Sequence, residues 1–399
     1  MSEHRQRQKQ RVPTAVFIIA FIFVAIASYA GGVYHTQILA AVGPLFGFKA
    51  YSGTLDLSSV QTTYQQLKAN FDGELDEKTL IDGANSGLVD AAGDKYTQFF
   101  NAKDSEAFND ELSGVVGGGV GLELSLRNDR ITVVRALEGN PGSKAGILAG
   151  DIISAVNGDS TEGWSVDDAV TKIRGEAGTT VKLSVLRGEQ KEDFTVTRAE
   201  ISNPSVYSSV QDGIGILTIS RFDSETGRLA RDAAESMKSQ SVKGVVLDLR
   251  SNGGGYLTAA QDVAGIWLDK KVVVTEKANG KVTDELFSSA NPVFKDMPTV
   301  VLVNGGTASA SEIVAGALLD YKVATLVGET TFGKGSVQQL IQLPRGAQLK
   351  VTIARWYTPQ GKNISETGIE PTQAVERTSD DVNAGRDPQL DAAKGALLQ

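Results

Sequence analysis

The longest apolar stretch of the chain lies near its beginning. Residues 14–34 form an almost uncharged segment, about as long as the ~20 residues that a membrane-spanning helix needs. A basic flank precedes it, formed by Arg5, Arg7, Lys9 and Arg11. Because basic flanks stay in the cytoplasm, this pattern predicts a cytoplasmic flank over 1–13, a transmembrane anchor over 14–34 and an extracytoplasmic remainder. A signal peptide cleaved after Ala30 is the alternative, but its apolar region is usually only about 7–15 residues long.

Helical spacing follows in residues 35–112. After a Gly-rich apolar connector over 36–54, residues 60–71 and 77–92 have the pattern of helices. Ser58 or Ser59 would cap the first helix and Asp76 the second, since short polar side chains accept hydrogen bonds from the first N–H groups. We expect a linker and a helical region here, and these helices are candidates for pairing two chains in a homodimer.

Residues 113–200 have the pattern of short strands and turns. A glycine loop over 116–121 leads into a strand, and Pro141 begins a short helix. Further strands are expected over 130–136, 152–156, 180–187 and 193–198, with an amphipathic helix over 166–174. The pattern predicts a separate β-rich domain.

Residues 201–375 alternate strands with helices, which is typical of an α/β domain. The expected strands cover 214–220, 244–249, 299–303 and 324–327, and the expected helices 226–240, 258–268 and 309–321. A hairpin is expected from 340–343 and 348–356. The tail, residues 376–399, should contain a short helix after Asp387.

The composition excludes several kinds of catalytic and binding site. The 399 residues include no cysteine, which excludes disulfides, thiolate catalysis and cysteine-ligated zinc. The net charge is −9 and no basic patch follows the apolar segment, so nucleic acid is not an expected partner. The only histidines, His4 and His35, flank that segment. A serine nucleophile would therefore need another base, and lysine is the leading candidate.

Ser309 is the candidate nucleophile, within a Gly- and Ser-rich segment over 304–312. Ser309 and Glu312 match the capping-box pattern, so an ordinary helix cap is the alternative. The two interpretations are compatible, because a serine at a helix N-terminus lies beside N–H groups that an oxyanion needs.

Lys334 lies between Gly333 and Gly335. An ordinary lysine has a pKa of about 10.4, so a catalytic one must be desolvated to lose its proton near neutral pH. A solvated loop lysine is one alternative. A phosphate-binding P-loop is another, since Gly328 and Gly333 precede the lysine at P-loop spacing, but Gly335 stands where Ser or Thr should be.

The loop over 250–255, Arg-Ser-Asn-Gly-Gly-Gly, follows an apolar strand. Such a loop presents backbone N–H groups to an anion, although a flexible turn has the same composition.

Together these motifs resemble the C-terminal processing peptidases, also called tail-specific proteases. The matching segments cover 247–255, 304–312, 327–338, 358–361 and 368–371 in this order. The resemblance implies a crotonase/Clp-protease-like β/α core, serine endopeptidase activity through a Ser–Lys dyad, and no metal or organic cofactor. One departure is Thr307, where the family commonly has serine.

The resemblance assigns roles to individual residues. Ser309 would be the nucleophile, Lys334 the general base and Gln338 the residue that orients the lysine. The oxyanion hole would use the N–H of Ala310 and one from Gly253 or Gly254.

Residues 113–200 resemble a circularly permuted PDZ domain. The resemblance implies binding of an extended protein C-terminus by strand addition. The candidate carboxylate loop consists of Gly118, Gly119, Val120, Gly121 and Leu122, and Leu124 would line the side-chain pocket with Val120 and Leu122. The alternative is a domain that only packs against the protease domain and binds no peptide. Arg174 is a candidate link to the protease domain, or else a solvated cation at a helix end.

The sequence thus predicts a membrane-anchored, extracytoplasmic serine endopeptidase that cleaves proteins recognised by their free C-terminal tails. Two alternatives remain open. One is a membrane-tethered PDZ adaptor that binds tails without cutting them, and the other is an NTPase.

Overall fold

The computed structural model describes residues 21, 24, 28, 55–113, 117–127, 129–137, 139–188, 190–201 and 203–398. The predicted anchor lies outside them, except that Phe21, Val24 and Ser28 are helical. In these described residues, no helix is both long and apolar enough to cross a membrane. The chain divides into two compact units, Met1–Leu80 and Ile81–Gln399.

The first unit contains α3 (Ser58–Asn70) and the start of α4 (Glu77–Asp90). Asp76 caps α4 as predicted, because its carboxylate accepts hydrogen bonds from the N–H groups of Lys78 and Thr79. The predicted cap of α3 is wrong. Ser58 is already the first residue of the helix, and its N–H donates to the carboxylate of Asp56.

The small domain, residues 117–201, is built on an antiparallel sheet in the order β3-β4-β5-β7-β8, with β6 paired to β5. Its elements are β2 (Gly118–Gly119), β3 (Leu122–Arg127), β4 (Arg130–Ala136), α6 (Pro141–Lys144), β5 (Ile152–Val156), β6 (Asp159–Ser160), α7 (Val166–Ile173), β7 (Thr180–Arg187), β8 (Gln190–Thr197) and β9 (Ala199–Glu200). Alternate residues of β4 and β7 face one core, which also buries Ile153 and Val156 of β5 and Ala169 and Ile173 of α7. The predicted β-rich domain is confirmed.

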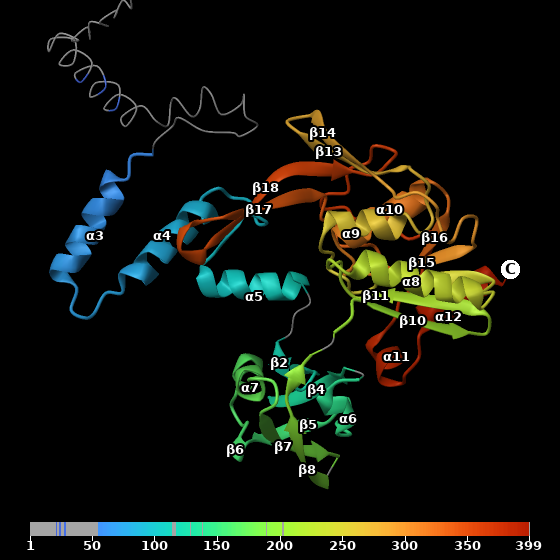
Figure 1. Ribbon diagram of the computed structural model, residues 1–399, viewed down its shortest axis with the longest axis horizontal. Coiled ribbons are helices and arrows are strands. Elements are labelled where there is room, and N and C mark those ends of the chain that lie inside the picture. Colours follow the sequence, from blue (N-terminus) through green and yellow to red (C-terminus); the bar gives the residue numbers. More distant parts are fainter. Residues whose placement is uncertain are drawn as a thin grey trace, which may run out of the picture. The chain divides into compact units, whose positions relative to one another are not determined.

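The core domain, residues 203–398, contains a sheet in the order β10-β11-β12-β15-β16-β19 (Figure 1). Its strands are β10 (Val206–Gln211), β11 (Ile214–Ile219), β12 (Gly244–Asp248), β15 (Thr299–Val303), β16 (Ala324–Gly328) and β19 (Gln373–Ala374). All neighbours from β11 to β19 run parallel, and β10 is antiparallel. Strands β12 and β15 are continuous apolar runs because both faces of the sheet are covered.

Helices cover the two faces of this sheet. One face packs with α8 (Thr226–Ser239), α9 (Leu257–Ala264) and α10 (Ala310–Asp320), and Val245 and Leu247 of β12 point to it. The other face packs with α12 (Pro388–Leu397), and Val246 of the same strand points to it. The tail also contains α11 (Ser379–Asn383). The predicted α/β core and terminal helix are confirmed.

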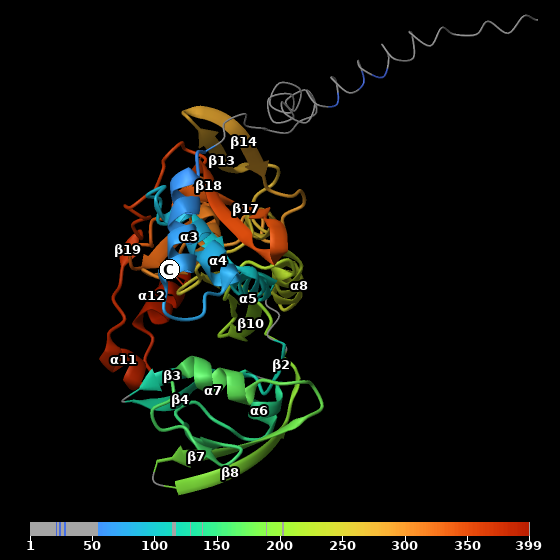
Figure 2. The same cartoon turned by 90° about the vertical axis from the view of Figure 1, so that its left-hand side faces the viewer.

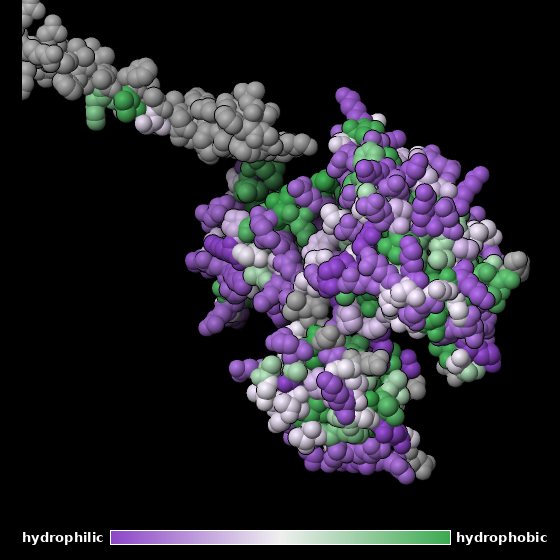
Figure 3. Space-filling view, turned by 45° about the vertical axis from the view of Figure 1, so that its right-hand side comes forward, coloured by the Kyte–Doolittle hydropathy of each residue, from purple (hydrophilic) through white to green (hydrophobic). Residues whose placement is uncertain are grey.

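A second sheet has the order β1-β18-β13-β14, with β17 paired to β18 (Figure 2). Its strands are β1 (Gln98–Phe100), β13 (Val272–Ala278), β14 (Lys281–Phe287), β17 (Ser336–Gln342) and β18 (Gln348–Tyr357). The predicted hairpin is β17–β18, whereas the hairpin β13–β14 was not predicted. After β1 follows α5 (Ala102–Ser113), and Phe108 of α5 stacks on Phe100 at 4.8 Å between ring centroids. The face shown in Figure 3 is mostly hydrophilic, with hydrophobic side chains in small groups.

Candidate active site

Ser309 lies on a sharp turn between β15 and α10. Its backbone has φ 56° and ψ −117°, a conformation that costs a non-glycine residue about 1–3 kcal/mol. The turn is held by Thr307, whose hydroxyl donates to the carbonyl of Leu249 at 2.8 Å and accepts the N–H of Asn304 at 3.0 Å. Thr307, the departure from the family pattern, therefore has a structural role here. Strain maintained by the surroundings is typical of a functional turn.

Glu312 connects the serine turn to the lysine loop. Its fully buried carboxylate accepts hydrogen bonds from the N–H of Ser309 at 2.8 Å and from the N–H of Lys334 at 3.0 Å. It also accepts from the N–H of Gly333 at 2.7 Å and the hydroxyl of Thr331 at 2.5 Å. The capping-box pattern identified the bond to Ser309, but no sequence signal connected Glu312 to Lys334.

Lys334 is desolvated. Burial lowers the pKa of its ammonium group, the positive charge of Lys350 lowers it further, and the negative charge of Glu312 opposes both effects. Its Nζ atom lies 5.4 Å from the ring centroid of Tyr96, a cation–π contact that favours the charged form. Burial is the largest of the electrostatic causes, and it shifts the pKa in the direction that a general base requires.

The flanking glycines allow the lysine loop to pack closely. A Cβ atom on Gly333 would lie 2.8 Å from the N of Gly368, and one on Gly335 would lie 2.6 Å from Oγ of Ser365. The loop then runs into β17, not into a helix. A P-loop needs a helix N-terminus after its lysine, so the P-loop interpretation is wrong.

Gln338 borders the same cavity as Lys334. Its amide nitrogen donates to the hydroxyl of Ser336 at 2.8 Å and to the hydroxyl of Thr352 at 3.3 Å. These two bonds fix the orientation of the amide, while its role in orienting Lys334 stays a prediction.

The glycine loop after β12 lies against the serine turn. The carbonyl of Asn252 accepts hydrogen bonds from the N–H of Ala308 and the hydroxyl of Ser311, both at 2.9 Å. Gly254 has φ +100°, and a Cβ atom there would lie 2.8 Å from Cβ of Ser309. Only glycine fits this approach.

The two candidate glycine donors differ. Both border the cavity, but the N–H of Gly254 donates to the side-chain oxygen of Asn252 at 2.9 Å, whereas Gly253 is exposed. Ala310 is the first residue of α10, where helical hydrogen bonding leaves N–H groups available. The geometry therefore favours Gly253 and Ala310 as an oxyanion hole, and it disfavours Gly254.

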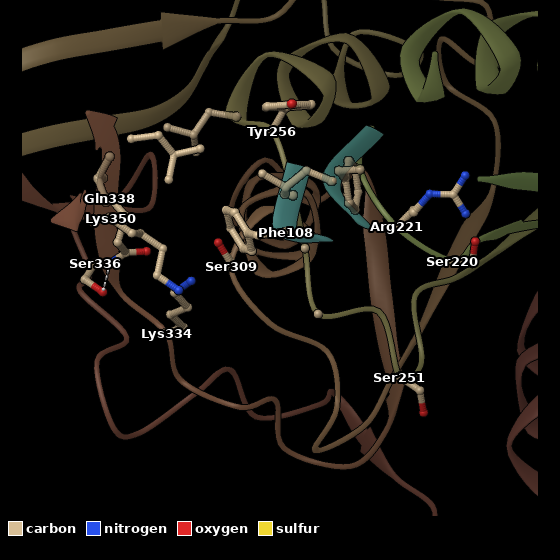
Figure 4. Close-up of a pocket in the computed structure, with 18 of the residues that line it drawn as sticks. Phe108, Ser220, Arg221, Ser251, Tyr256, Ser309, Lys334, Ser336, Gln338 and Lys350 are labelled. Atoms are coloured by element: carbon tan, nitrogen blue, oxygen red, sulfur yellow. Dashed lines mark hydrogen bonds between the residues drawn. The ribbon is translucent and has the colours of Figure 1, made fainter. Parts of the chain in front are cut away.

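These groups surround one cavity of about 560 Å³ (Figure 4). Ser309, Lys334, Gln338 and Gly253 all line it. Apolar side chains form part of the wall: Phe108, Leu112, Tyr256, Leu257, Val337 and Leu340. Charged side chains line it too, among them Arg221 and Lys350. A desolvated lysine, a serine on a strained turn and backbone donors at one cavity are the groups that acyl transfer without histidine requires. Among the residues that the structure describes, no cluster of His, Cys, Asp or Glu has the composition to hold a metal ion.

The predicted carboxylate loop of the small domain serves several purposes. Gly118 and Gly119 form β2, which pairs with β9. Val120 is only 2% exposed and packs in the domain core, so its side chain contributes to the core first. Leu122 begins β3, which pairs only with β4 among the strands that the structure describes and lies at the end of its sheet. The free edge of β3 is where an added strand would bind.

Arg174 is exposed at the C-cap of α7. Its role in coupling the PDZ domain to the protease domain stays a prediction.

Comparisons with known proteins identify the family and the domains of the chain. The profile of Peptidase family S41 matches residues 213–375, and that of the PDZ domain matches residues 111–186. The chain is 34% identical to the "Carboxy-terminal processing protease CtpA" of Bacillus subtilis (strain 168) over 384 residues, which cover 95% of this chain and 80% of that protein.

Two further relatives extend this result. A "Probable CtpA-like serine protease" of Staphylococcus aureus (strain MSSA476) is 34% identical over 353 residues, covering 87% of this chain and 71% of that protein. The solved structure of a photosystem II D1 C-terminal processing protease is 30% identical, with a TM-score of 0.51, and the match covers 81% of this chain and 87% of that one. The expected family and its associated small domain are thus confirmed: the chain belongs to the C-terminal processing serine proteases of peptidase family S41 and carries a PDZ domain.

Proposed function

We propose that this protein is a membrane-anchored, extracytoplasmic endopeptidase that cleaves protein substrates recognised by their free C-terminal tails, with Ser309 as nucleophile and Lys334 as general base. One observation carries the proposal. The buried carboxylate of Glu312 binds the N–H groups of both Ser309 and Lys334, which fixes both residues at one cavity. Such preorganisation is what covalent catalysis requires.

The reaction follows from the geometry. The neutral amine of Lys334 takes the proton of the Ser309 hydroxyl while Oγ attacks the substrate carbonyl. The N–H groups of Gly253 and Ala310 stabilise the oxyanion of the tetrahedral intermediate. The Lys334 ammonium then gives its proton to the leaving amine, and the C–N bond breaks. Water attacks the acyl-enzyme by the same route and regenerates the serine.

Tail recognition is assigned to the PDZ domain. A substrate C-terminus would pair with the free edge of β3, beside α7, and the glycines before it would hold the terminal carboxylate. The apolar segment over 14–34 supports the anchor, and the basic flank supports the extracytoplasmic side. Pairing of two chains through the helices at 58–110 and the terminal helix stays a prediction.

The test compares the full-length chain with Ser309→Ala and Lys334→Ala on an unstructured polypeptide that ends in a free carboxylate. Both substitutions should reduce cleavage by at least about 1,000-fold, as removal of a nucleophile or its base does in serine proteases. Lys295→Ala, which removes an exposed lysine, is the matched control and should cleave normally. Tail binding without cleavage by the wild type would favour the adaptor instead, and cleavage that persists in Ser309→Ala would exclude this dyad.

A further inference from the structure

The glycine loop of the active site is tied to the tail of the chain through Arg250. This arginine lies two residues after β12 ends at Asp248, and three residues before Gly253. Its guanidinium bonds to Asp248 through Nε at 2.9 Å and through Nη2 at 2.6 Å. It bonds on its other side to Asp387 through Nη1 at 2.8 Å and Nη2 at 2.9 Å.

Gln389 completes the acceptors around the Arg250 guanidinium. Its side-chain oxygen accepts a hydrogen bond from Nη1 of Arg250 at 3.0 Å, so all five N–H groups of the guanidinium have an acceptor. The arginine side chain is only 12% exposed and that of Asp387 only 21%. Two-point bonds between a planar guanidinium and a carboxylate fix direction as well as distance.

Asp387 and Gln389 belong to the start of α12, red in Figure 2. Asp387 is the N-cap of this helix and accepts the N–H of Leu390 at 3.1 Å. Burial opposes the charge of Asp387, but the bonds from Arg250 and Leu390 outweigh it and hold the pKa of this carboxyl below its usual range. The helix itself packs on the sheet through Ala393, which is fully buried, and Leu390.

The same helix start also reaches the lysine side of the site. The amide nitrogen of Gln389, a residue only 1% exposed, donates to the carboxylate of Glu329 at 3.2 Å and to the carbonyl of Val375 at 2.8 Å. Glu329 directly follows β16 and begins the segment that carries Lys334. One helix end therefore contacts the segments that lead to both halves of the site.

From these contacts we infer that Asp387 is a positioning residue, which holds the oxyanion loop over 251–255 in its active geometry through Arg250. The effect on catalysis rests on the proposed function, whereas the effect on the loop does not. Asp387 touches no reacting atom. Its loss would leave the guanidinium attached to Asp248 and Gln389 only, and the loop after it would lose one of its fixed points.

The test uses the full-length chain with Asp387→Asn. Asparagine keeps the size of the side chain and is itself a good helix cap, so α12 should remain folded. The matched control is Asp391→Asn, an exposed aspartate in the first turn of the same helix. We expect kcat to fall about 10-fold in Asp387→Asn, with KM within about two-fold, because a displaced oxyanion donor affects the transition state more than substrate binding. The unfolding midpoint should fall as well, since the lowered pKa means that the charged carboxylate stabilises the fold, so activity is measured well below that midpoint. Asp391→Asn should match the wild type.

A double-mutant cycle tests the path through Arg250. Arg250→Lys keeps the charge but loses the planar fork, so Asp387→Asn should reduce kcat little further in that background. A full additional 10-fold loss would show that Asp387 acts by another route and would overturn the inference. An unchanged kcat in the single variant would also overturn it.

Hydrogen exchange of the amides over 251–255 gives a readout that needs no activity. Exchange should become several-fold faster in Asp387→Asn and remain at the wild-type rate in Asp391→Asn. If the wild type cleaves no substrate, the proposed function fails, while this exchange result still decides whether Asp387 positions the loop. Equal exchange in all three proteins would overturn the inference even if catalysis is confirmed.

Discussion

The loops of the active site and those of the PDZ domain are both rich in glycine, but they are held very differently. At the active site, the carbonyl of Asn252 accepts two hydrogen bonds, and the carboxylate of Glu312 accepts four. In the PDZ domain, Gly139 and Gly163 have positive φ, and a Cβ atom on either would meet open space. Gly139 and Gly163 serve the turn alone, whereas Gly118 and Gly121 of the same domain also pack closely, as Gly254 does at the active site. The difference between the two regions therefore lies in the buried acceptors of Asn252 and Glu312.

This difference follows from what each region does. Stabilising an oxyanion requires donors that are already in place, since any movement during the reaction reduces their effect. Binding a chain end by strand addition requires an open edge, which β3 provides. We therefore expect substitutions in the two regions to have different kinetic signatures, on kcat in the first and on tail-dependent KM in the second.

Among these comparisons, the largest loss of activity is expected from a substitution of Glu312. In Glu312→Gln one acceptor oxygen becomes an NH₂ group, which faces N–H and O–H donors and leaves buried groups unsatisfied. We expect kcat/KM to fall about 100- to 1,000-fold and the protein to lose roughly 2–3 kcal/mol of stability. Peptidase assays and denaturant unfolding measure both. Glu235→Gln, an exposed glutamate on α8, is the control. Wild-type activity in Glu312→Gln would remove the main support for the dyad geometry.

The next largest loss of activity is expected at Gly254, and it can be compared with Gly139, which also has a positive φ. Gly254→Ala places a methyl group against Ser309 and should reduce kcat at least about 100-fold. Gly139→Ala has the same backbone strain, about 1–2 kcal/mol, but meets no neighbour, so its kcat should not change. Activity and unfolding midpoints of both variants test this. Equal losses of activity would mean that strain alone, and not the approach to Ser309, explains the effect.

The strands that the sequence predicted best are those with the strongest apolar pattern. The bounds of β4, β7 and β15 match the predictions, because each alternates or runs apolar between turn residues. The hairpin β13–β14 escaped prediction because β14, Lys281–Phe287, is almost entirely exposed and lacks that pattern.

The site was predictable only in its local parts. Ser309 and Glu312 are three residues apart, so the capping box was visible in the sequence. Arg250 and Asp387 are 137 positions apart, and no local rule connects them. Nothing in the sequence showed that the N–H of Gly254 is occupied by Asn252, which is why the choice between Gly253 and Gly254 needed the fold.

A smaller effect is expected when Lys350 is substituted, and it concerns the pH dependence of kcat/KM. Lys334 acts as a base only when neutral, so kcat/KM should fall as the pH drops through its pKa. Burial and the positive charge of Lys350 lower that pKa, and Glu312 opposes them. Lys350→Met removes the repulsion, raises the pKa of Lys334 and should move the acid limb of the profile to higher pH. Activity on that limb should be several-fold lower than in the wild type.

The control for this change is Lys281→Met, which removes an exposed charge on β14. Its pH profile should overlay that of the wild type. A limb that moves to lower pH in Lys350→Met, or one that moves equally in both variants, would contradict a local effect of Lys350 on Lys334.

The smallest effect is expected at Arg174, and it tests whether the PDZ domain communicates with the active site at all. Arg174→Ala removes an exposed cation at the end of α7 and should leave the fold intact. If Arg174 couples tail binding to cleavage, kcat/KM for a substrate with a free C-terminus should change several-fold, while that for an amidated substrate should not. Lys172→Ala, an exposed lysine of the same helix, is the control. Unchanged rates on the tailed substrate, or equal changes in both variants, would show that Arg174 is only a solvated cation at the helix end, where a positive charge is favourable for the helix itself.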